Sequence, residues 1–218
     1  MSIADSRADV LGRIRSRLGR NAQQDAAAAE RVAAALGAPR PGPRPPLPAD
    51  LVQCFITRSL AMQSTVARVA APADVPRACA DYLASLELAP GAVCWPQLAG
   101  YDWAAAGLEV ALRAAHGDDA TGITGCFCAL AETGTLLLCS GPDSPASVSL
   151  LPETHIAIVP AARIVAGMEE AWALLRAEAG GVPRSLNFVS GPSRTGDIEQ
   201  TIVLGAHGPY RVHLIVVG

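Results

Sequence analysis

The chain has 218 residues, of which half are apolar and 4% are aromatic, and its formal charge is −3. This length holds one good-sized domain with a helical extension, and the core must be built from Ala, Val, Leu and Ile. The acidic balance, with no basic block, argues against nucleic-acid binding. All seventeen basic residues are Arg, so a lysine Schiff base and a P-loop lysine are excluded.

The first segment, residues 5–37, is rich in Ala, Arg and Leu and predicts two helices that separate near Gly19. One apolar stripe recurs in it at helical spacing, formed by Val10, Ile14 and Leu18. Residues 37–48 contain six prolines, which remove backbone donors and forbid a helix. We therefore predict two parts: an N-terminal helical arm with a Pro-rich linker at 1–48, and an α/β domain at 49–218.

From residue 49 onward, helical and strand patterns alternate along the chain. Helical patterns cover 49–63, 73–86 and 166–179. Strand patterns cover 65–70, 92–95, 122–130, 135–139, 155–159, 185–189 and 210–217, and 103–113 is irregular or helical. This alternation predicts an α/β fold with an open, largely parallel sheet and flanking helices, whose ligands bind beyond the carboxyl ends of the strands. No G-x-G-x-x-G motif follows the first strand, which argues against a dinucleotide-binding Rossmann domain.

Neither a signal peptide nor a membrane span is indicated by the apolar patterning, so we expect a soluble, cytoplasmic protein. Six cysteines lie in apolar stretches and are expected to be buried thiols: Cys54, Cys79, Cys94, Cys126, Cys128 and Cys139. The close pair Cys126 and Cys128 lacks the spacing of a zinc or iron–sulfur site. We therefore expect neither a metal nor a redox cofactor in this chain.

The segment after the strand at 185–189 has the composition of an anion-binding loop. Small and hydroxylated residues turn the chain, and Thr195 is a candidate N-cap, with Asp197 and Glu199 in the first helical turn. A helix N-terminus offers free N–H groups to an anion, and Arg194 adds a planar fork of donors. The alternative is an ordinary βα turn whose polar residues only cap the helix.

A second candidate lies between the strands at 122–130 and 135–139. Glu132 stands beside Gly134 in this break and is a candidate nucleophile, general base or ligand contact, because burial near apolar neighbours would raise its pKa. In the alternative interpretation, Glu132 faces water and Gly134 supplies an unusual backbone angle in a turn.

The four histidines occupy different contexts. His207 lies between glycines in a loop, where its proton would titrate near neutral pH. His213 is expected to be a satisfied core histidine, His155 to cap a turn or line a cleft, and His116 to lie on the surface. Because the plausible ligands lie on separate segments, spacing does not predict a metal site.

Four ordered motifs resemble those of the LUD-domain family, and within it the C-type lactate-utilisation group. They are A-E-T-G-T-L-L-L-C-S-G-P at 131–142, L-L-P-E-T-H-I-A-I-V-P at 150–160, S-G-P-S-R-T-G-D-I-E at 190–199 and G-A-H-G-P-Y-R-V-H-L-I-V-V at 205–217. The similarity runs from about residue 121 to residue 218 and is weaker over 49–120.

The resemblance implies a fold like that of the NagB/RpiA/CoA-transferase group. It also implies a subunit or accessory protein of an iron–sulfur system that oxidises L-lactate to pyruvate, with the clusters in partner subunits and no cofactor in this chain. Two alternatives stay open. One is a small-molecule enzyme of CoA-transferase or sugar-phosphate-isomerase type that uses Glu132 and Arg194, and the other is a structural or regulatory protein that binds a ligand without turnover.

We predict one cleft at the sheet edge, where a small carboxylate or phosphate binds. Glu132 and His207 are the candidate catalytic, proton-transferring residues. The candidate binding residues share hydroxyl, guanidinium, carboxylate or backbone N–H groups and are Thr133, Gly134, Thr135, Ser190, Gly191, Ser193, Arg194, Thr195 and Asp197.

Overall fold

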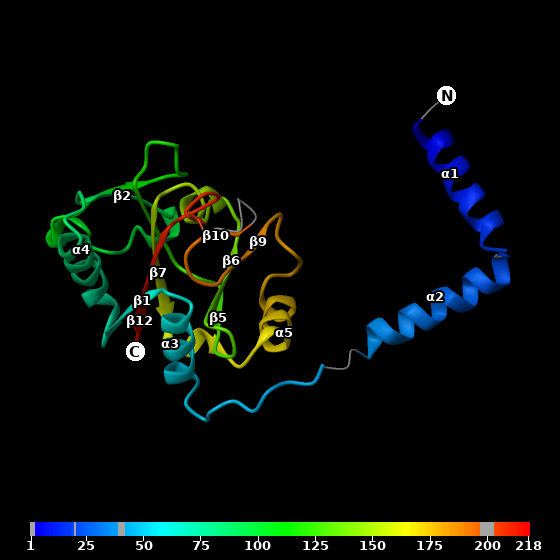
Figure 1. Cartoon of the computed structure of the whole chain (residues 1–218), viewed down its shortest axis with the longest axis horizontal. Coiled ribbons are helices and arrows are strands. Elements are labelled where there is room, and N and C mark those ends of the chain that lie inside the picture. Colours follow the sequence, from blue (N-terminus) through cyan, green and yellow to red (C-terminus); the bar gives the residue numbers. More distant parts are fainter. Residues whose placement is uncertain (1–2, 20, 39–41, 197–202) are drawn as a thin grey trace. The chain divides into compact units, whose positions relative to one another are not determined.

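The computed structural model describes residues 3–19, 21–38, 42–196 and 203–218, and it divides the chain into the compact units Met1–Pro45 and Pro46–Gly218 (Figure 1). The first unit contains the two predicted helices, α1 (Ile3–Arg17) and α2 (Ala22–Gly37). Asn21 caps α2, because its side chain accepts a hydrogen bond from the Gln24 N–H at 2.9 Å and Gln24 reciprocates at 3.0 Å. The predicted apolar stripe of α1 is exposed, with Val10 at 46% and Leu18 at 62%.

The second unit is built on a six-stranded sheet, in which all paired neighbours are parallel and the order is β1-β12-β7-β4-β2-β3. The strands are β1 (Thr65–Val69), β2 (Gly91–Cys94), β3 (Glu109–Leu112), β4 (Thr121–Thr124), β7 (Thr154–Pro160) and β12 (Arg211–Val217). This arrangement confirms the predicted α/β class with a largely parallel sheet. The strand β3 was missed, since the pattern over 103–113 is interrupted by a 3-10 helix at Ala104–Ala106 and a left-handed Gly107.

A second, smaller sheet was not predicted. It has the order β8-β5-β6-β9, with strands β5 (Cys128–Leu130), β6 (Thr135–Cys139), β8 (Ile164–Val165) and β9 (Leu186–Val189). The predicted strand at 122–130 divides at Gly125, so that β4 joins the six-stranded sheet and β5 begins the smaller one. The strand predicted as buried at 185–189 is β9, which lies at a sheet edge and exposes 37% of Phe188.

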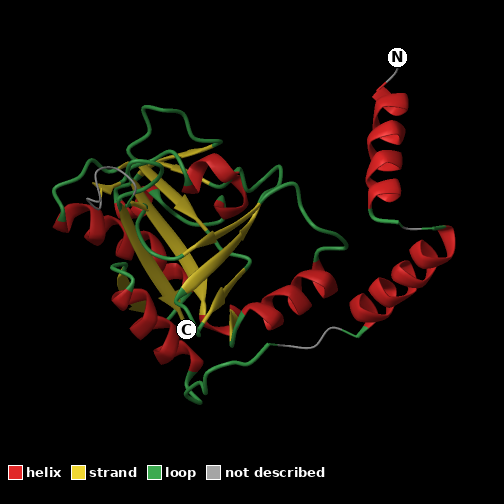
Figure 2. Cartoon of the chain, turned by 45° about the vertical axis from the view of Figure 1, so that its right-hand side comes forward, coloured by secondary structure: helices red, strands yellow, loops and turns green. Residues whose placement is uncertain are grey.

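In the part of this unit that the structure describes, three helices flank the sheets: α3 (Leu51–Ala61), α4 (Val75–Ser85) and α5 (Met168–Glu178). Asp50 caps α3 by accepting a hydrogen bond from the Gln53 N–H at 2.9 Å. Figures 1 and 2 show α4 and α5 on opposite sides of the strands. Short 3-10 helices occupy Pro72–Asp74, Pro96–Leu98, Ala146–Ser149 and Ala161–Arg163. Within the described ranges, no helix combines the length and apolar character needed to cross a bilayer.

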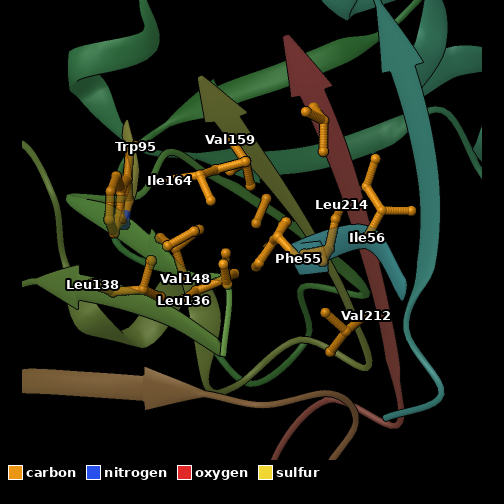
Figure 3. Packing of buried hydrophobic residues seen from close by; sticks show 14 of the residues in the cluster. Phe55, Ile56, Trp95, Leu136, Leu138, Val148, Val159, Ile164, Val212 and Leu214 are labelled. Atoms are coloured by element: carbon orange, nitrogen blue, oxygen red, sulfur yellow. The ribbon is translucent and has the colours of Figure 1, made fainter. Parts of the chain in front are cut away.

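Alternation along the central strands divides the core between the two faces of the six-stranded sheet. In β7, Ile156 and Ile158 pack toward α4, whereas Ala157 and Val159 pack on the other face. That second face meets α3 and the smaller sheet in an apolar layer, shown in Figure 3. The labelled members of the layer are Phe55, Ile56, Trp95, Leu136, Leu138, Val148, Val159, Ile164, Val212 and Leu214. The helix α5 covers the outer face of the smaller sheet through Ala171.

Candidate functional site

The two motifs that carry most of the predicted site residues lie at the same end of the smaller sheet. The turn Ala131–Gly134 joins β5 to β6, and the loop after β9 begins at Ser190. Because β6 and β9 are antiparallel neighbours, with Leu136 opposite Val189, the start of one strand lies beside the end of the other.

A chain of hydroxyl groups connects these two segments. The Thr135 Oγ1 lies 2.6 Å from the Ser190 Oγ and 2.7 Å from the Thr133 Oγ1. Three predicted binding residues therefore contact one another directly, and their hydroxyls satisfy one another's hydrogen bonds.

Two glycines bring both segments onto the carboxyl-terminal end of α3. Gly134 has φ +67°, and a Cβ there would lie 2.5 Å from the Ser59 nitrogen. Gly191 has φ +76°, and a Cβ there would collide with the Met62 carbonyl oxygen. The unusual backbone angle considered for Gly134 is thus present, and its role is close packing against a helix.

Arg194 also contacts this helix end, since its Nη2 donates a hydrogen bond to the Met62 carbonyl oxygen at 2.8 Å. The predicted helix start at Thr195 is wrong: Thr195 lies in β10 (Arg194–Thr195), which pairs with β11 (Val203–Leu204). Gly196, which would be the first helical residue, is irregular. Asp197 and Glu199 lie outside the described residues.

The loop that carries His207 is joined to the Ser190–Thr195 loop by backbone hydrogen bonds. The Ser193 N–H donates to the Pro209 carbonyl at 2.8 Å, and the Gly205 N–H donates to the Ser193 carbonyl at 3.0 Å. His207 is exposed. The His207 loop directly precedes β12, so both loops lie at the amino end of the six-stranded sheet. The prediction had placed them at the carboxyl ends of the strands. The difference arises because β9, which leads into the Ser190–Thr195 loop, belongs to the smaller sheet.

Glu132 is half-buried, and its backbone N–H donates to the Ala166 carbonyl at 3.0 Å. Across the described residues, no hydrogen bond or ion pair joins the side chains of Glu132, Arg194 and His207. The Ser190–Thr195 loop therefore contacts the turn that carries Glu132 and also the loop that carries His207. A catalytic cleft shared by the three side chains stays a prediction.

Two histidines lie inside the sheet. His155 is fully buried, so its predicted place at a turn or cleft is wrong; its Nε2 lies 2.8 Å from the Thr124 Oγ1. His213 is a core residue as predicted, with its ring 3.8 Å from that of Tyr82 and its Nδ1 2.8 Å from the Thr65 Oγ1, but it is not fully satisfied, because its buried Nε2 has no hydrogen-bond partner among the described residues. Burial lowers the pKa of each histidine to about 4. Both imidazoles are therefore neutral at physiological pH.

The predicted burial of cysteines holds for Cys54, Cys79, Cys94 and Cys128, while Cys126 and Cys139 are half-buried. Burial raises the pKa of the Cys79, Cys94 and Cys126 thiols to about 12, so these groups stay protonated at neutral pH. Among the residues that the structure describes, no cluster of three or more His, Cys, Asp and Glu side chains could hold a metal ion.

A cavity of about 250 Å³ at the opposite end of the six-stranded sheet was not predicted from the sequence motifs. It is lined by Trp95, Gln97, Cys126, Phe127, Cys139, Ser144, Arg163 and Glu178. These residues come from five separate segments, and no local motif unites them. Trp95 and Cys126 follow the observed strands β2 and β4, whereas the predicted strands at 92–95 and 122–130 include them, so no positional signal was available in the sequence.

Together, the six-stranded parallel sheet and the smaller sheet packed on it define an α/β protein of the open-sheet class. The LUD domain model matches residues 96–217, which is more than half of the chain and includes every predicted site residue. The chain belongs to the LUD-domain family.

Curated relatives agree with this assignment. The chain is 43% identical over 129 residues to Lactate utilization protein C of Bacillus licheniformis, covering 56% of this chain and 53% of that protein. It is 46% identical over 99 residues to Lactate utilization protein C of Bacillus subtilis, covering 44% of this chain and 41% of that protein. The matches thus span about half the length of these relatives or less.

The fold has a solved counterpart. A DUF162 family protein from Deinococcus radiodurans, with a crystal structure at 1.70 Å resolution, superposes with a TM-score of 0.60 at 29% identity. The match covers 79% of this chain and 100% of that one. The predicted family and the predicted fold class are both confirmed.

Proposed function

We propose that this chain acts in lactate utilisation, as a subunit or accessory protein of an iron–sulfur system that oxidises L-lactate to pyruvate. The observation that carries the proposal is the 43–46% identity to proteins named Lactate utilization protein C. The LUD domain match at residues 96–217 includes the turn around Glu132 and the loop around Arg194.

In this proposal the redox centres belong to partner proteins. The placement of the possible ligands supports this division, because no three His, Cys, Asp or Glu side chains among the described residues are grouped as a metal site would require. The chain would then contribute binding or assembly to the lactate-oxidising system, and its partners would be iron–sulfur proteins.

Growth on defined carbon sources tests the proposal. A host strain that lacks this chain should grow on pyruvate like its parent and fail, or grow slowly, on L-lactate. Restoring the full chain should restore growth on L-lactate. Unchanged growth of the deletion strain on L-lactate as sole carbon source would overturn the proposal.

Copurification tests the partner assignment. Tagged full-length protein, recovered from cells grown on L-lactate, should bring down proteins that contain iron and acid-labile sulfide. The same protein expressed alone should show no flavin or iron–sulfur absorbance. A stoichiometric chromophore in the isolated chain would contradict the division of roles.

We also propose that the Ser190–Thr195 loop contacts an anion through Arg194. Support comes from its exposed guanidinium and from the hydroxyl of Ser190 nearby in the chain. Replacing Arg194 by Ala should weaken the binding of inorganic phosphate roughly tenfold, as expected for the loss of one charge-assisted contact. Arg184→Ala, at an exposed position before β9, is the matched control and should leave phosphate binding unchanged. Equal binding by the two variants would refute this contact.

The enzymatic alternative has one structural observation in its favour. The loops that carry Glu132 and Arg194 both pack on the end of α3, through Gly134 and through the Met62 carbonyl. A screen with acyl-CoA, hydroxy-acid and phosphosugar substrates should reveal turnover that Glu132→Gln abolishes. Binding without product in every case would leave the chain as a non-catalytic component.

A further inference from the structure

The cavity of about 250 Å³ lies where an open parallel sheet is best suited to hold a ligand. Trp95 and Gln97 follow the end of β2, Cys126 follows the end of β4, and Arg163 follows the end of β7. These three strands are neighbours, in the order β7-β4-β2. The chain continues from β2 to β3 on one side and from β4 to β7 on the other, so the cavity lies at the topological switch point.

Arg163 is fixed at one side of this cavity. Its Nε donates to the Phe127 carbonyl at 2.8 Å, and its guanidinium lies 4.9 Å from the centre of the Phe127 ring. The side chain is 30% exposed, so a ligand in solvent can reach the guanidinium. Its position is set by the contacts with Phe127, which lies just before β5 of the smaller sheet. A guanidinium held by its Nε presents its two terminal nitrogens as a preorganised fork.

A carboxylate already occupies that fork. The Nη1 and Nη2 of Arg163 each lie 2.9 Å from an oxygen of Glu178, which is the bidentate geometry that a ligand carboxylate would adopt. Glu178 is the last residue of α5, and its side chain is 43% exposed. Release of this carboxylate into water therefore leaves no buried, unpaired charge.

The other groups around the cavity suit a small organic molecule. Trp95 already donates its indole N–H to the Pro145 carbonyl, and the Ser144 hydroxyl donates to the Cys139 carbonyl. The Gln97 side-chain amide makes no hydrogen bond to any described residue, so it is available to a polar ligand. With Cys126 protonated, Arg163 and Glu178 are the only charged groups in the lining.

We propose that this cavity binds a small organic monocarboxylate, whose carboxylate replaces that of Glu178 on Arg163. Glu178 then acts as an intramolecular competitor that satisfies the guanidinium until the ligand arrives, and Gln97 offers its amide to a polar substituent of the ligand. The carboxylate class follows from Arg163 and the cavity alone. The choice of L-lactate and pyruvate as probes rests on the proposed function.

Calorimetric titration of the full chain with L-lactate, pyruvate and acetate tests the exchange. Glu178→Gln removes the competing charge and leaves Arg163 in place, so it should bind these acids roughly tenfold more tightly than the native chain. Arg163→Gln should lose measurable binding. Arg176→Gln, at an exposed position on the same helix, is the control and should bind like the native chain.

The gain of affinity in Glu178→Gln does not depend on how well Arg163→Gln folds. If Glu178→Gln binds all three acids no better than the native chain, or if a folded Arg163→Gln binds them equally well, the site is refuted. The proposed function can fail separately. Binding of the acids with normal growth of the deletion strain on L-lactate would refute the function alone, whereas a growth defect without binding would refute the site alone.

Discussion

At the amino end of the six-stranded sheet, the loops around Gly134 and Gly191 pack directly on helix α3, whereas at the carboxyl end the segments after β2, β4 and β7 leave a cavity. Both ends carry an arginine near a turn. Arg194 donates to a backbone carbonyl of the adjoining helix, while Arg163 binds a side chain that can leave. An anion at Arg194 would therefore bind the exposed guanidinium at the surface, beside its bond to Met62, whereas an acid at Arg163 would displace Glu178 and enter a cavity.

Gly191→Ala should have the largest effect on the amino end. Its left-handed backbone disfavours a Cβ, and that Cβ would collide with the Met62 carbonyl, which belongs to the backbone and not to a flexible side chain. We expect a loss of roughly 2–5 kcal/mol in the free energy of unfolding, measured by urea denaturation. Gly117→Ala is the control, because a Cβ there meets nothing within 4 Å.

The same variant tests the comparison between the two ends. Acid binding at the Arg163 cavity should persist in any Gly191→Ala protein that stays folded, because the loop and the cavity lie at opposite ends of the sheet. An unfolding free energy within about 0.5 kcal/mol of the Gly117→Ala control would mean that the amino end is not tightly closed.

Much of this fold could be predicted from local patterns. Apolar runs located β1, β2, β7 and β12, and helical periodicity located α3, α4 and α5. The division of strands between two sheets could not be predicted, because it depends on the break at Gly125 and on long-range pairing of β6 with β9. Periodicity reports whether a residue is buried, and it does not report which sheet buries it.

The candidate site shows a similar limit. The unusual backbone angle considered for Gly134 is present, whereas Gly191 was predicted only as a binding residue. Small residues can make room for a ligand or for a helix, and only the structure distinguishes the two. The ion pair of Arg163 with Glu178 joins residues 15 positions apart on different elements. The motif at Ser190 attracted attention because its polar residues are contiguous, and the carboxyl-end cavity has no such signature.

Acid should weaken the amino half of the sheet before the carboxyl end. His155 and His213 lie near the amino ends of β7 and β12, and burial lowers their pKa from 6.5 to about 4. The unfolded chain therefore binds more protons than the native chain between these values, so stability is complete above pH 6.5 and falls as the pH decreases toward 4. At pH 5 the loss should be about 2 kcal/mol per histidine relative to pH 7 or above.

Urea denaturation at pH 7 and pH 5 measures this loss. His155→Gln should reduce the pH dependence by about half, because one of the two shifted groups is removed. His116→Gln, at an exposed position, is the control and should keep the native pH dependence. Protection from hydrogen exchange, after correction for the slower intrinsic exchange at pH 5, should decrease in the loop at 205–209 before it decreases at Ala161–Arg163. An equal decrease at both ends would remove this distinction between them.

The smallest effect concerns the hydroxyl chain that joins the two loops at the amino end. The Ser190 Oγ lies 2.6 Å from the Thr135 Oγ1, and Thr135 is 4% exposed, whereas Ser190 is exposed. A double-mutant cycle of Ser190→Ala with Thr135→Val should therefore give a coupling free energy of about 1 kcal/mol. Ser85 lies on α4, which packs against the opposite face of the sheet, so a cycle of Ser190→Ala with Ser85→Ala should show no coupling. If the two cycles give the same value, the hydroxyl contact adds nothing to the closure of this end, and the glycine packing alone keeps the loops together.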